Sequence, residues 1–201
     1  FISIKGAVVR PGNTAWKEGM KVSEIFGQVH ASLLPTADAS MALIIRSLDS
    51  GNEVEVLGLR LQEALQKPGS SADIHLRPRD EILVFEQSGA QAAKNRRALL
   101  MELVEKLVQQ GRLSERLDIV KLEGAFDEAG YYPYMRGMRV SDIVLLAGRG
   151  GSFAEQVDLN AAAIVRQKNT GNGLEVLKLN LWHVLSSPGS DADLSLEPSD
   201  T

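Results

Sequence analysis

The segment GAFDEAGYYPYMRGMRVSDI (Gly124–Ile143) has an earlier counterpart in the same chain, GAVVRPGNTAWKEGMKVSEI (Gly6–Ile25). The two segments are related by a fixed shift of 118 residues, and self-similarity at a fixed shift indicates duplication of a structural unit. Glycines, and the residues that follow the last glycine, recur at matching positions: Gly6 and Gly124, Gly12 and Gly130, Gly19 and Gly137, Met20 and Met138, Val22 and Val140, Ser23 and Ser141.

The similarity continues beyond this segment after a change of two residues in length, with a shift of 120. The identities then include Arg46 and Arg166, Glu55-Val56-Leu57 and Glu175-Val176-Leu177, Leu61 and Leu181, Pro68-Gly69-Ser70 and Pro188-Gly189-Ser190, Asp73 and Asp193, Asp80 and Asp200. Chance does not produce so many ordered identities with one small gap. The sequence therefore predicts two copies of one domain.

Composition limits the class of protein. The 201 residues are 44% hydrophobic and 24% charged, which is typical of a globular protein, and no apolar run approaches the ~18 residues of a membrane span. There is no cysteine, which excludes disulfides, thiolate nucleophiles and cysteine-bound zinc. The net charge of −4 argues against binding to nucleic acid. Because Phe1 stands in what reads as the middle of a strand, we expect the sequence to be part of a longer protein.

Each copy predicts the same order of elements. In the first copy, alternating apolar residues from Phe1 predict a strand, and Pro11-Gly12 predicts the turn of a hairpin. An apolar stripe from Val22 to Val29 predicts a helix. A second hairpin, a short helix and a brief strand at Ile74-His75-Leu76 follow, and Glu81–Phe85 is the expected closing strand. Helices on one side of a mixed sheet make an α+β fold, and this order matches a β-grasp.

The second copy ends before the counterpart of that closing strand. A sheet without this strand has an unpaired edge, so we expect truncation or disorder at the C-terminal end. The predicted caps also differ between the copies: Asn180 is a good N-cap for the short helix, and its counterpart Arg60 is not.

One helix is predicted between the copies, from Ala90 to Gln110, with Gly111 as its C-cap. The domain prediction is a first β-grasp domain at residues 1–87, a linker helix at 88–117 and a second domain at 118–201.

Two candidate sites carry arginine. Arg46 and Arg166 lie at equivalent strand ends and are candidates for binding an anion or a sugar acid; the alternative is an internal ion pair, for example with Glu55 or Glu175 across the hairpin. Arg149 lies in Gly148–Ser152, which resembles a phosphate cradle. That segment lacks the Gly-Lys-Ser/Thr ending of a P-loop and follows a helix, so a flexible helix exit is the alternative.

Aromatic residues are the other candidates. Trp16 in the first copy and Tyr131, Tyr132 and Tyr134 in the second could stack on sugar rings, and alternation would place Tyr132 and Tyr134 on one sheet face. The alternative is that they fill the core of a small sheet. The repeated aspartates, Asp73 with Asp193 and Asp80 with Asp200, are interpreted as turn-forming residues. The three histidines share no metal-ligand spacing, so we expect no metal and no cofactor.

The repeated motifs resemble the soluble-ligand-binding β-grasp (SLBB) domain. The motifs are Gly-x-Val-x-x-Pro-Gly, Gly-Met-x-Val-Ser-Asp/Glu-Ile and Leu-x-Pro-x-Asp; the second copy has Ala129 in place of Pro11. With the Arg96-Arg97-Ala98-Leu99-Leu100 helix between them, two such domains resemble the periplasmic part of outer-membrane polysaccharide export proteins.

The resemblance implies a non-catalytic role in exporting capsular polysaccharide or exopolysaccharide. It implies rings of a homo-oligomer around a channel, and an inner-membrane partner for polymerisation and chain length. It also implies a periplasmic location, attached to the outer membrane through an export motif, a lipid-bearing cysteine and a membrane-crossing helix that these 201 residues do not contain. The alternative function is a monomeric β-grasp module that binds a sugar or another small ligand.

Overall fold

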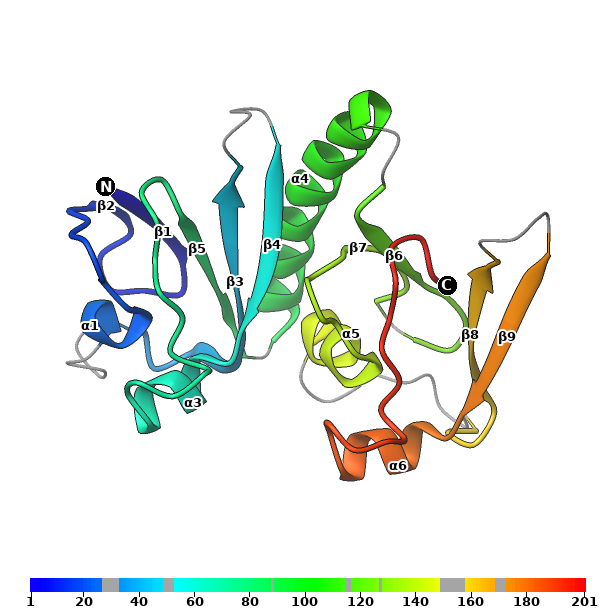
Figure 1. Ribbon diagram of the computed structural model, residues 1–201. Coiled ribbons are helices and arrows are strands. Elements are labelled where there is room, and N and C mark those ends of the chain that lie inside the picture. Colours follow the sequence, from blue (N-terminus) through cyan, green and yellow to red (C-terminus); the bar gives the residue numbers. More distant parts are fainter. Residues whose placement is uncertain are drawn as a thin grey trace. The chain divides into compact units, whose positions relative to one another are not determined.

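The computed structural model describes residues 1–26, 33–48, 53–87, 89–114, 117–126, 128–148, 158–168 and 173–201. The fold is mixed α+β, as the sequence predicts (Figure 1). The chain divides into two compact units, Phe1–Arg96 (unit 1) and Arg97–Thr201 (unit 2), so the boundary falls inside the long helix between the copies. Arg149 lies outside the described residues.

Unit 1 contains one five-stranded sheet in the order β2-β1-β5-β3-β4. β1 and β5 run parallel at its centre, and β5 pairs antiparallel with β3 on its other side. The elements of unit 1 are β1 (Ile2–Gly6), β2 (Gly12–Thr14), α1 (Val22–Phe26), β3 (Ala37–Ser47), β4 (Val54–Leu59), α3 (Leu61–Gln66) and β5 (Glu81–Glu86).

The core of unit 1 lies between the sheet and its short helices. Ile82 and Val84 of β5 are fully buried in this core, together with Ile44 of β3 and Leu61 of α3. β5 therefore joins the two halves of the sheet and also contributes to the core that they share.

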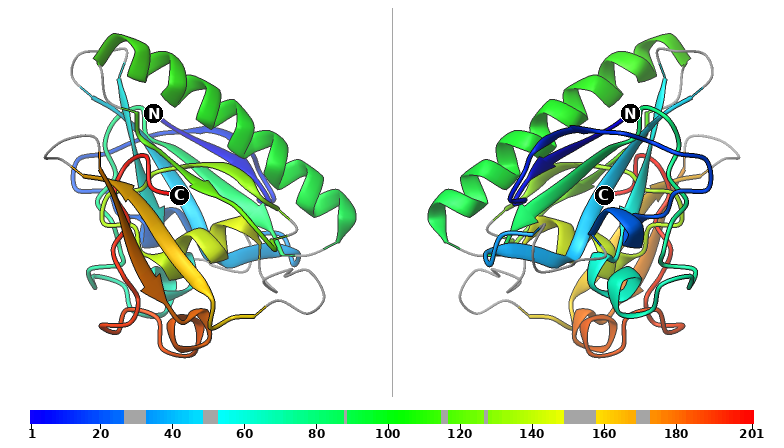
Figure 2. Two further views of the ribbon diagram at one scale, coloured as in Figure 1. Left: turned by 90° about the vertical axis from the view of Figure 1, so that its right-hand side faces the viewer. Right: turned by 90° about the vertical axis from the view of Figure 1, so that its left-hand side faces the viewer.

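The helix α4 (Ala90–Ser114) is continuous, as Figure 2 shows. It passes through Gly111, so the predicted C-cap at that residue is wrong. Gly111 is not among the glycines with positive φ, which the left-handed conformation of a glycine cap requires. A single glycine weakens a helix by only about 1 kcal/mol relative to alanine, and here the helix continues for three more residues.

Unit 2 repeats the elements of unit 1 up to the place of β5. Its strands form two separate two-stranded sheets, β6-β7 and β8-β9. The elements that follow α4 are β6 (Ile119–Leu122), β7 (Gly130–Pro133), α5 (Val140–Ala147), β8 (Ala162–Gln167), β9 (Leu174–Leu179) and α6 (Leu181–Ser186).

The short helices confirm the predicted difference in their caps. The Asn180 side chain accepts a hydrogen bond from the His183 N–H at 3.0 Å, whereas the Arg60 side chain makes no cap hydrogen bond. The brief strand predicted around His75 is wrong, because the structure has only an isolated bridge between Lys21 and His75. Pairing over one residue is too short to form a strand.

Candidate functional site

Each unit holds an arginine that is paired with a buried aspartate. In unit 1, Arg46 donates from Nε to Asp80 Oδ1 at 3.1 Å and from Nη2 to Asp80 Oδ2 at 2.8 Å. The same Nη2 donates to the His75 carbonyl at 2.8 Å. The Asp80 side chain is fully buried, and that of Arg46 is 8% exposed. Arg46 therefore forms an internal ion pair, which the sequence gave as the alternative to an anion-binding site. Its partner is Asp80, the residue just before β5.

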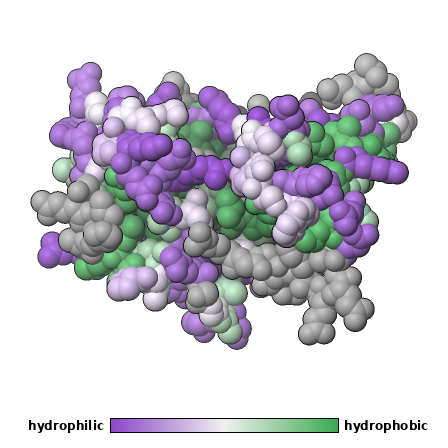
Figure 3. Space-filling model, turned by 90° about the horizontal axis from the view of Figure 1, so that it is seen from below, coloured by the Kyte–Doolittle hydropathy of each residue, from purple (hydrophilic) through white to green (hydrophobic). Residues whose placement is uncertain are grey.

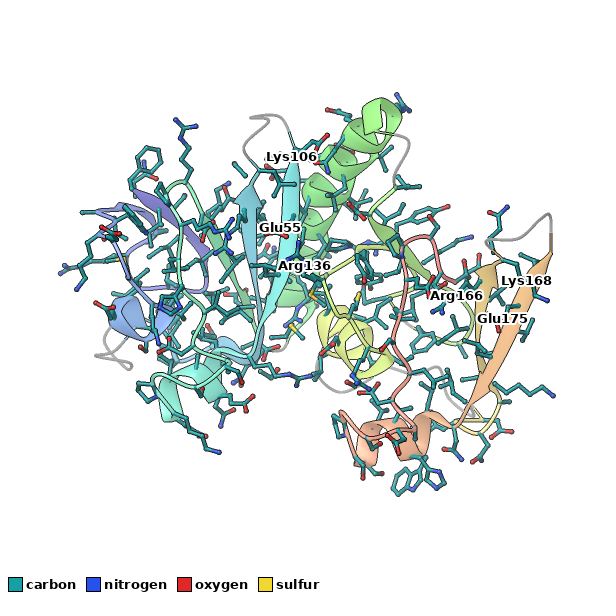
Figure 4. The ribbon with its side chains drawn as sticks, in the orientation of Figure 1. Glu55, Lys106, Arg136, Arg166, Lys168 and Glu175 are labelled. Carbon is teal, nitrogen blue, oxygen red and sulfur yellow. The ribbon has the colours of Figure 1, made fainter. Side chains whose placement is uncertain are left out.

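Unit 2 repeats this ion pair. Arg166 donates from Nε to Asp200 Oδ1 at 2.9 Å and from Nη2 to Oδ2 at 2.6 Å, and Nη2 also donates to the Ser195 carbonyl at 3.0 Å. The hydrogen bond to Asp200 raises the pKa of Arg166 further above its ordinary value. Figure 4 labels Arg166 on β8 and Glu175 on β9, which lie opposite each other in the strand register. An external anion at either arginine would compete with a carboxylate of the chain itself.

A second polar cluster fixes the start of α1 in unit 1 and of α5 in unit 2. In unit 1, Asp73 accepts hydrogen bonds from the Ser23 N–H at 2.9 Å, the Ser23 hydroxyl at 2.8 Å and the Gly69 N–H at 2.8 Å. The Ser23 hydroxyl therefore donates to Asp73. The same carboxylate also accepts a hydrogen bond from the Ser23 backbone N–H, which lies in the first turn of α1. The carboxylate satisfies a donor that has no partner inside the helix.

The equivalent cluster in unit 2 has the same geometry. Asp193 accepts from the Ser141 N–H at 2.9 Å, the Ser141 hydroxyl at 2.7 Å and the Gly189 N–H at 2.8 Å. The sequence interpretation gave these aspartates a role in turns and missed their link to the serines. A signal was present, because Ser and Asp recur together in both copies.

Opposing effects determine the pKa of the Asp73 carboxyl. Burial raises this pKa, and the hydrogen bonds from Gly69 and Ser23 lower it. The hydrogen bonds outweigh burial, so the pKa lies below the ordinary value of an aspartate. Asp73 is consequently an anion at neutral pH and not a proton donor.

A third buried ion pair, between Asp38 and Arg96, was not predicted. Arg96 Nη2 donates to Asp38 Oδ2 at 2.7 Å and to the Glu86 carbonyl at 2.8 Å, and the guanidinium lies 4.9 Å from the centre of the Phe85 ring. This pair attaches the first turns of α4 to the end of β5. The counterpart of Asp38 in unit 2, Asp158, is exposed.

The four aromatic candidates have different environments. Trp16 is half-buried in unit 1 and donates from Nε1 to the Leu76 carbonyl at 2.9 Å. Tyr132 is 1% exposed and its hydroxyl donates to the Glu128 carbonyl, while Tyr134 is half-buried just after β7. Tyr131 is 50% exposed, and the Lys121 Nζ lies 5.6 Å from its ring centre. Of these four, Tyr131 has the most accessible ring for a sugar.

A groove of about 510 Å³ lies in unit 2. Its walls come from β6, α5 and β8, with Asp200 and Thr201 at one end. The lining is mainly aliphatic and includes Val120, Leu122, Ile143, Val144, Ile164 and Leu196. Because polar catalytic groups are few here, the groove suits an apolar occupant.

Comparison with known proteins identifies no relative: no family model matches the chain, and no curated protein sequence matches it. Within the described residues, no helix is both long and apolar enough to cross a bilayer. The described part of the chain also contains no group of three His, Cys, Asp or Glu residues placed to hold a metal ion.

Proposed function

We propose that this chain is the ring-forming periplasmic portion of an outer-membrane export channel for capsular polysaccharide or exopolysaccharide, and that it acts without catalysis. In this proposal each unit is a β-grasp domain of the SLBB type. The order of strands in unit 1, with β1 and β5 parallel at the centre and β3-β4 beside them, is consistent with that assignment.

The observation that carries the proposal is the repetition of both polar clusters in the two units. The arginine–aspartate pair and the aspartate–serine–glycine cluster recur with hydrogen bonds of nearly the same length. These are the most prominent polar residues that the two copies share, and both sets stabilise the units. Because the shared polar residues stabilise the fold in both units, a scaffold protein that assembles is favoured, and an enzyme with a single active centre is disfavoured.

In the proposed channel, copies of this chain associate into a homo-oligomeric ring, polysaccharide is the cargo, and an inner-membrane polymerisation and chain-length protein is the partner. The test is sedimentation velocity of the intact protein that contains this chain, across a hundredfold range of concentration, followed by electron microscopy of any larger species. Ring-shaped assemblies of defined subunit number are the expected result. A strict monomer at the highest concentration contradicts the ring.

One observation favours the second candidate, a monomeric sugar-binding module: the exposed ring of Tyr131 beside Lys121. Titration of the chain with acidic and neutral oligosaccharides tests it by calorimetry. Binding that is lost in Tyr131→Ala and retained in Tyr134→Phe supports this module. Absence of heat at millimolar oligosaccharide contradicts it.

A further inference from the structure

Unit 2 exposes a tryptophan on α6. Trp182 is 61% exposed, whereas its neighbour Leu181 is 5% exposed. The equivalent residue of α3 in unit 1 is Gln62, which is exposed as well. Unit 1 contains β5 and still exposes this position, so the exposure of Trp182 is a property of the helix face and not of the sheet beside it.

An exposed tryptophan becomes informative when a matching pocket exists. Single exposed apolar residues are common on protein surfaces, so Trp182 alone identifies no partner. Tryptophan is nevertheless one of the residues that most often dominate the binding energy of protein interfaces, where it fills a pocket on the partner. Covering an aromatic side chain of this class removes about 150–250 Å² from water.

Unit 1 has such a pocket, a groove of about 690 Å³ beside α3 (the α3 groove). Its apolar residues include Leu34, Pro35, Ala37 and Leu65, and its amides include those of Gln62 and Gln66. No described residue of its lining is charged. Gln62, Leu65 and Gln66 fall at helix positions i, i+3 and i+4, so one face of α3 forms a wall of the groove.

Backbone hydrogen bonds hold the other wall. The Leu34 N–H donates to the Ala7 carbonyl at 3.1 Å, and the Ala37 N–H donates to the Leu34 carbonyl at 2.9 Å. The Gln87 N–H donates to the Thr36 carbonyl at 2.8 Å, which ties this wall to the end of β5. The α3 groove is therefore formed within the five-stranded unit, away from the first and last residues of the sequence.

The chemistry of the α3 groove suits an indole. Its apolar walls take the ring, and the side-chain carbonyls of Gln62 and Gln66 are acceptors for the indole N–H, which usually finds a partner when it is buried. A charged side chain would find no opposite charge in the described lining. The helix α6 contains no Asp, Glu, Lys or Arg, so it brings no such charge with Trp182.

From these observations we propose that Trp182 of one copy of this chain docks into the α3 groove of a second copy. Trp182 is exposed in the single chain, so what covers it is another molecule, and every copy supplies a groove of matching chemistry. The tryptophan and the groove lie in different units, so the contact is heterologous: each copy gives a tryptophan to one neighbour and receives one from the other.

Heterologous contacts generate a ring when the rotation between neighbours closes, and an open filament when it does not. The inference rests on the proposed homo-oligomer and names one of its contacts. Docking and ring closure are measured separately below, so either can fail alone.

The first experiment replaces Trp182 by the photoreactive residue p-benzoylphenylalanine in the intact protein that contains this chain. Copies labelled with a heavy nitrogen isotope are mixed with unlabelled copies at low concentration, concentrated and irradiated, and mass spectrometry locates the linked peptides. Links from position 182 of one isotope to residues 33–39 or 62–66 of the other are expected. Links only within one chain, links only to other segments, or no links between copies overturn the docking.

The second experiment alters each half of the contact. Trp182→Gln introduces the residue that unit 1 has at the equivalent position, and Leu34→Asp places a carboxylate in the α3 groove. Each should weaken association of the intact protein at least about tenfold in sedimentation velocity, with the circular dichroism spectrum of the parent. Met101→Gln, which changes an exposed apolar residue of α4, is the matched control and should leave association unchanged.

Mixing the two variants tests the direction of the contact. Trp182→Gln keeps an intact groove and Leu34→Asp keeps an intact tryptophan, so the mixture should form dimers at concentrations at which each variant alone is a monomer. A mixture that associates no better than the separate variants overturns the heterologous docking. Rings that form from Trp182→Gln as readily as from the parent also overturn it, and leave the proposed ring standing. Linked copies that never close into rings overturn the ring and leave the docking.

Discussion

Units 1 and 2 have the same polar clusters but different sheets. Asp80 and Asp200 are 0% and 1% exposed, and each receives a bidentate arginine. In unit 1 the strand β5 lies between the two hairpins, whereas the described residues of unit 2 form two separate two-stranded sheets. The second hairpin of each unit is β3-β4 in unit 1 and β8-β9 in unit 2. On this hairpin, Val56 is 3% exposed in unit 1 and its counterpart Val176 is 57% exposed in unit 2.

This difference separates two kinds of stabilisation. The polar clusters join a helix start or a strand end to a turn, so they form in both units. Burial of the second hairpin does not follow from those clusters, since Leu174 and Val176 stay exposed although Arg166 and Asp200 are paired. In the space-filling view, hydrophobic residues are visible among hydrophilic ones on the face that it shows (Figure 3).

The two tryptophans of the chain allow the units to be followed separately, because Trp16 lies in unit 1 and Trp182 in unit 2. In a Trp182→Phe background the fluorescence of Trp16 reports unfolding of unit 1. In a Trp16→Phe background Trp182 reports unit 2. Equivalent substitutions in the two units can therefore be compared in these two backgrounds.

The largest effect is expected from Asp80→Ala. This change leaves the buried Arg46 guanidinium without its carboxylate, and loss of one partner of a buried ion pair costs about 3–5 kcal/mol. Asp200→Ala should cost less, because the Arg166 side chain is 16% exposed and also bonds to Glu197 at 2.7 Å. Urea unfolding of both variants measures the two free energies.

The control for this pair is Glu197→Ala, which removes an exposed partner of Arg166 and should change the free energy of unfolding by no more than about 1 kcal/mol. Equal costs for Asp80→Ala and Asp200→Ala would show that the exposure of Arg166 does not weaken its ion pair.

A smaller effect that depends on pH is expected from Asp73→Asn. Hydrogen bonds to a charged group contribute about 1.5–3 kcal/mol, and the amide cannot accept all three that the carboxylate accepts. The folded pKa lies below the unfolded value of about 3.9, so this stabilisation is complete above that value. It is lost as the pH falls through the folded pKa.

The measurement for Asp73 is the difference in free energy of unfolding between the parent and Asp73→Asn, from pH 7 down to pH 2. The difference should be constant above about pH 5 and shrink below pH 4. Asp191→Asn, at an exposed position, is the control and should leave the free energy of unfolding within about 0.5 kcal/mol of the parent. A difference that grows with acidity would mean that the carboxyl is stabilised in its protonated form.

The sequence predicted the features that rest on local pattern or on repetition. The α+β class and the cap at Asn180 follow from residue types at short range or from matched copies. For Arg46 the sequence left two alternatives open, an anion site and an internal ion pair. It did not identify Asp80 as the partner, because Asp80 is 34 residues away and Glu55 is the nearer carboxylate in the hairpin. Gly111 misled the helix prediction because residue type alone does not reveal whether a glycine takes positive φ. The groove required coordinates, since its walls come from segments between Val120 and Thr201 that meet only in the fold.

The smallest effect is expected on the second hairpin, from Val56→Ala and Val176→Ala. The first removes two buried methyl groups, which at about 0.8 kcal/mol each, with a small cavity, gives about 1.5–2.5 kcal/mol. The second changes an exposed side chain and should stay within about 0.5 kcal/mol of the parent. The Trp16 and Trp182 backgrounds measure the two values by urea unfolding. A cost for Val176→Ala as large as that for Val56→Ala would mean that β9 is covered in solution, and dilution of the sample would then tell whether another copy of the chain covers it.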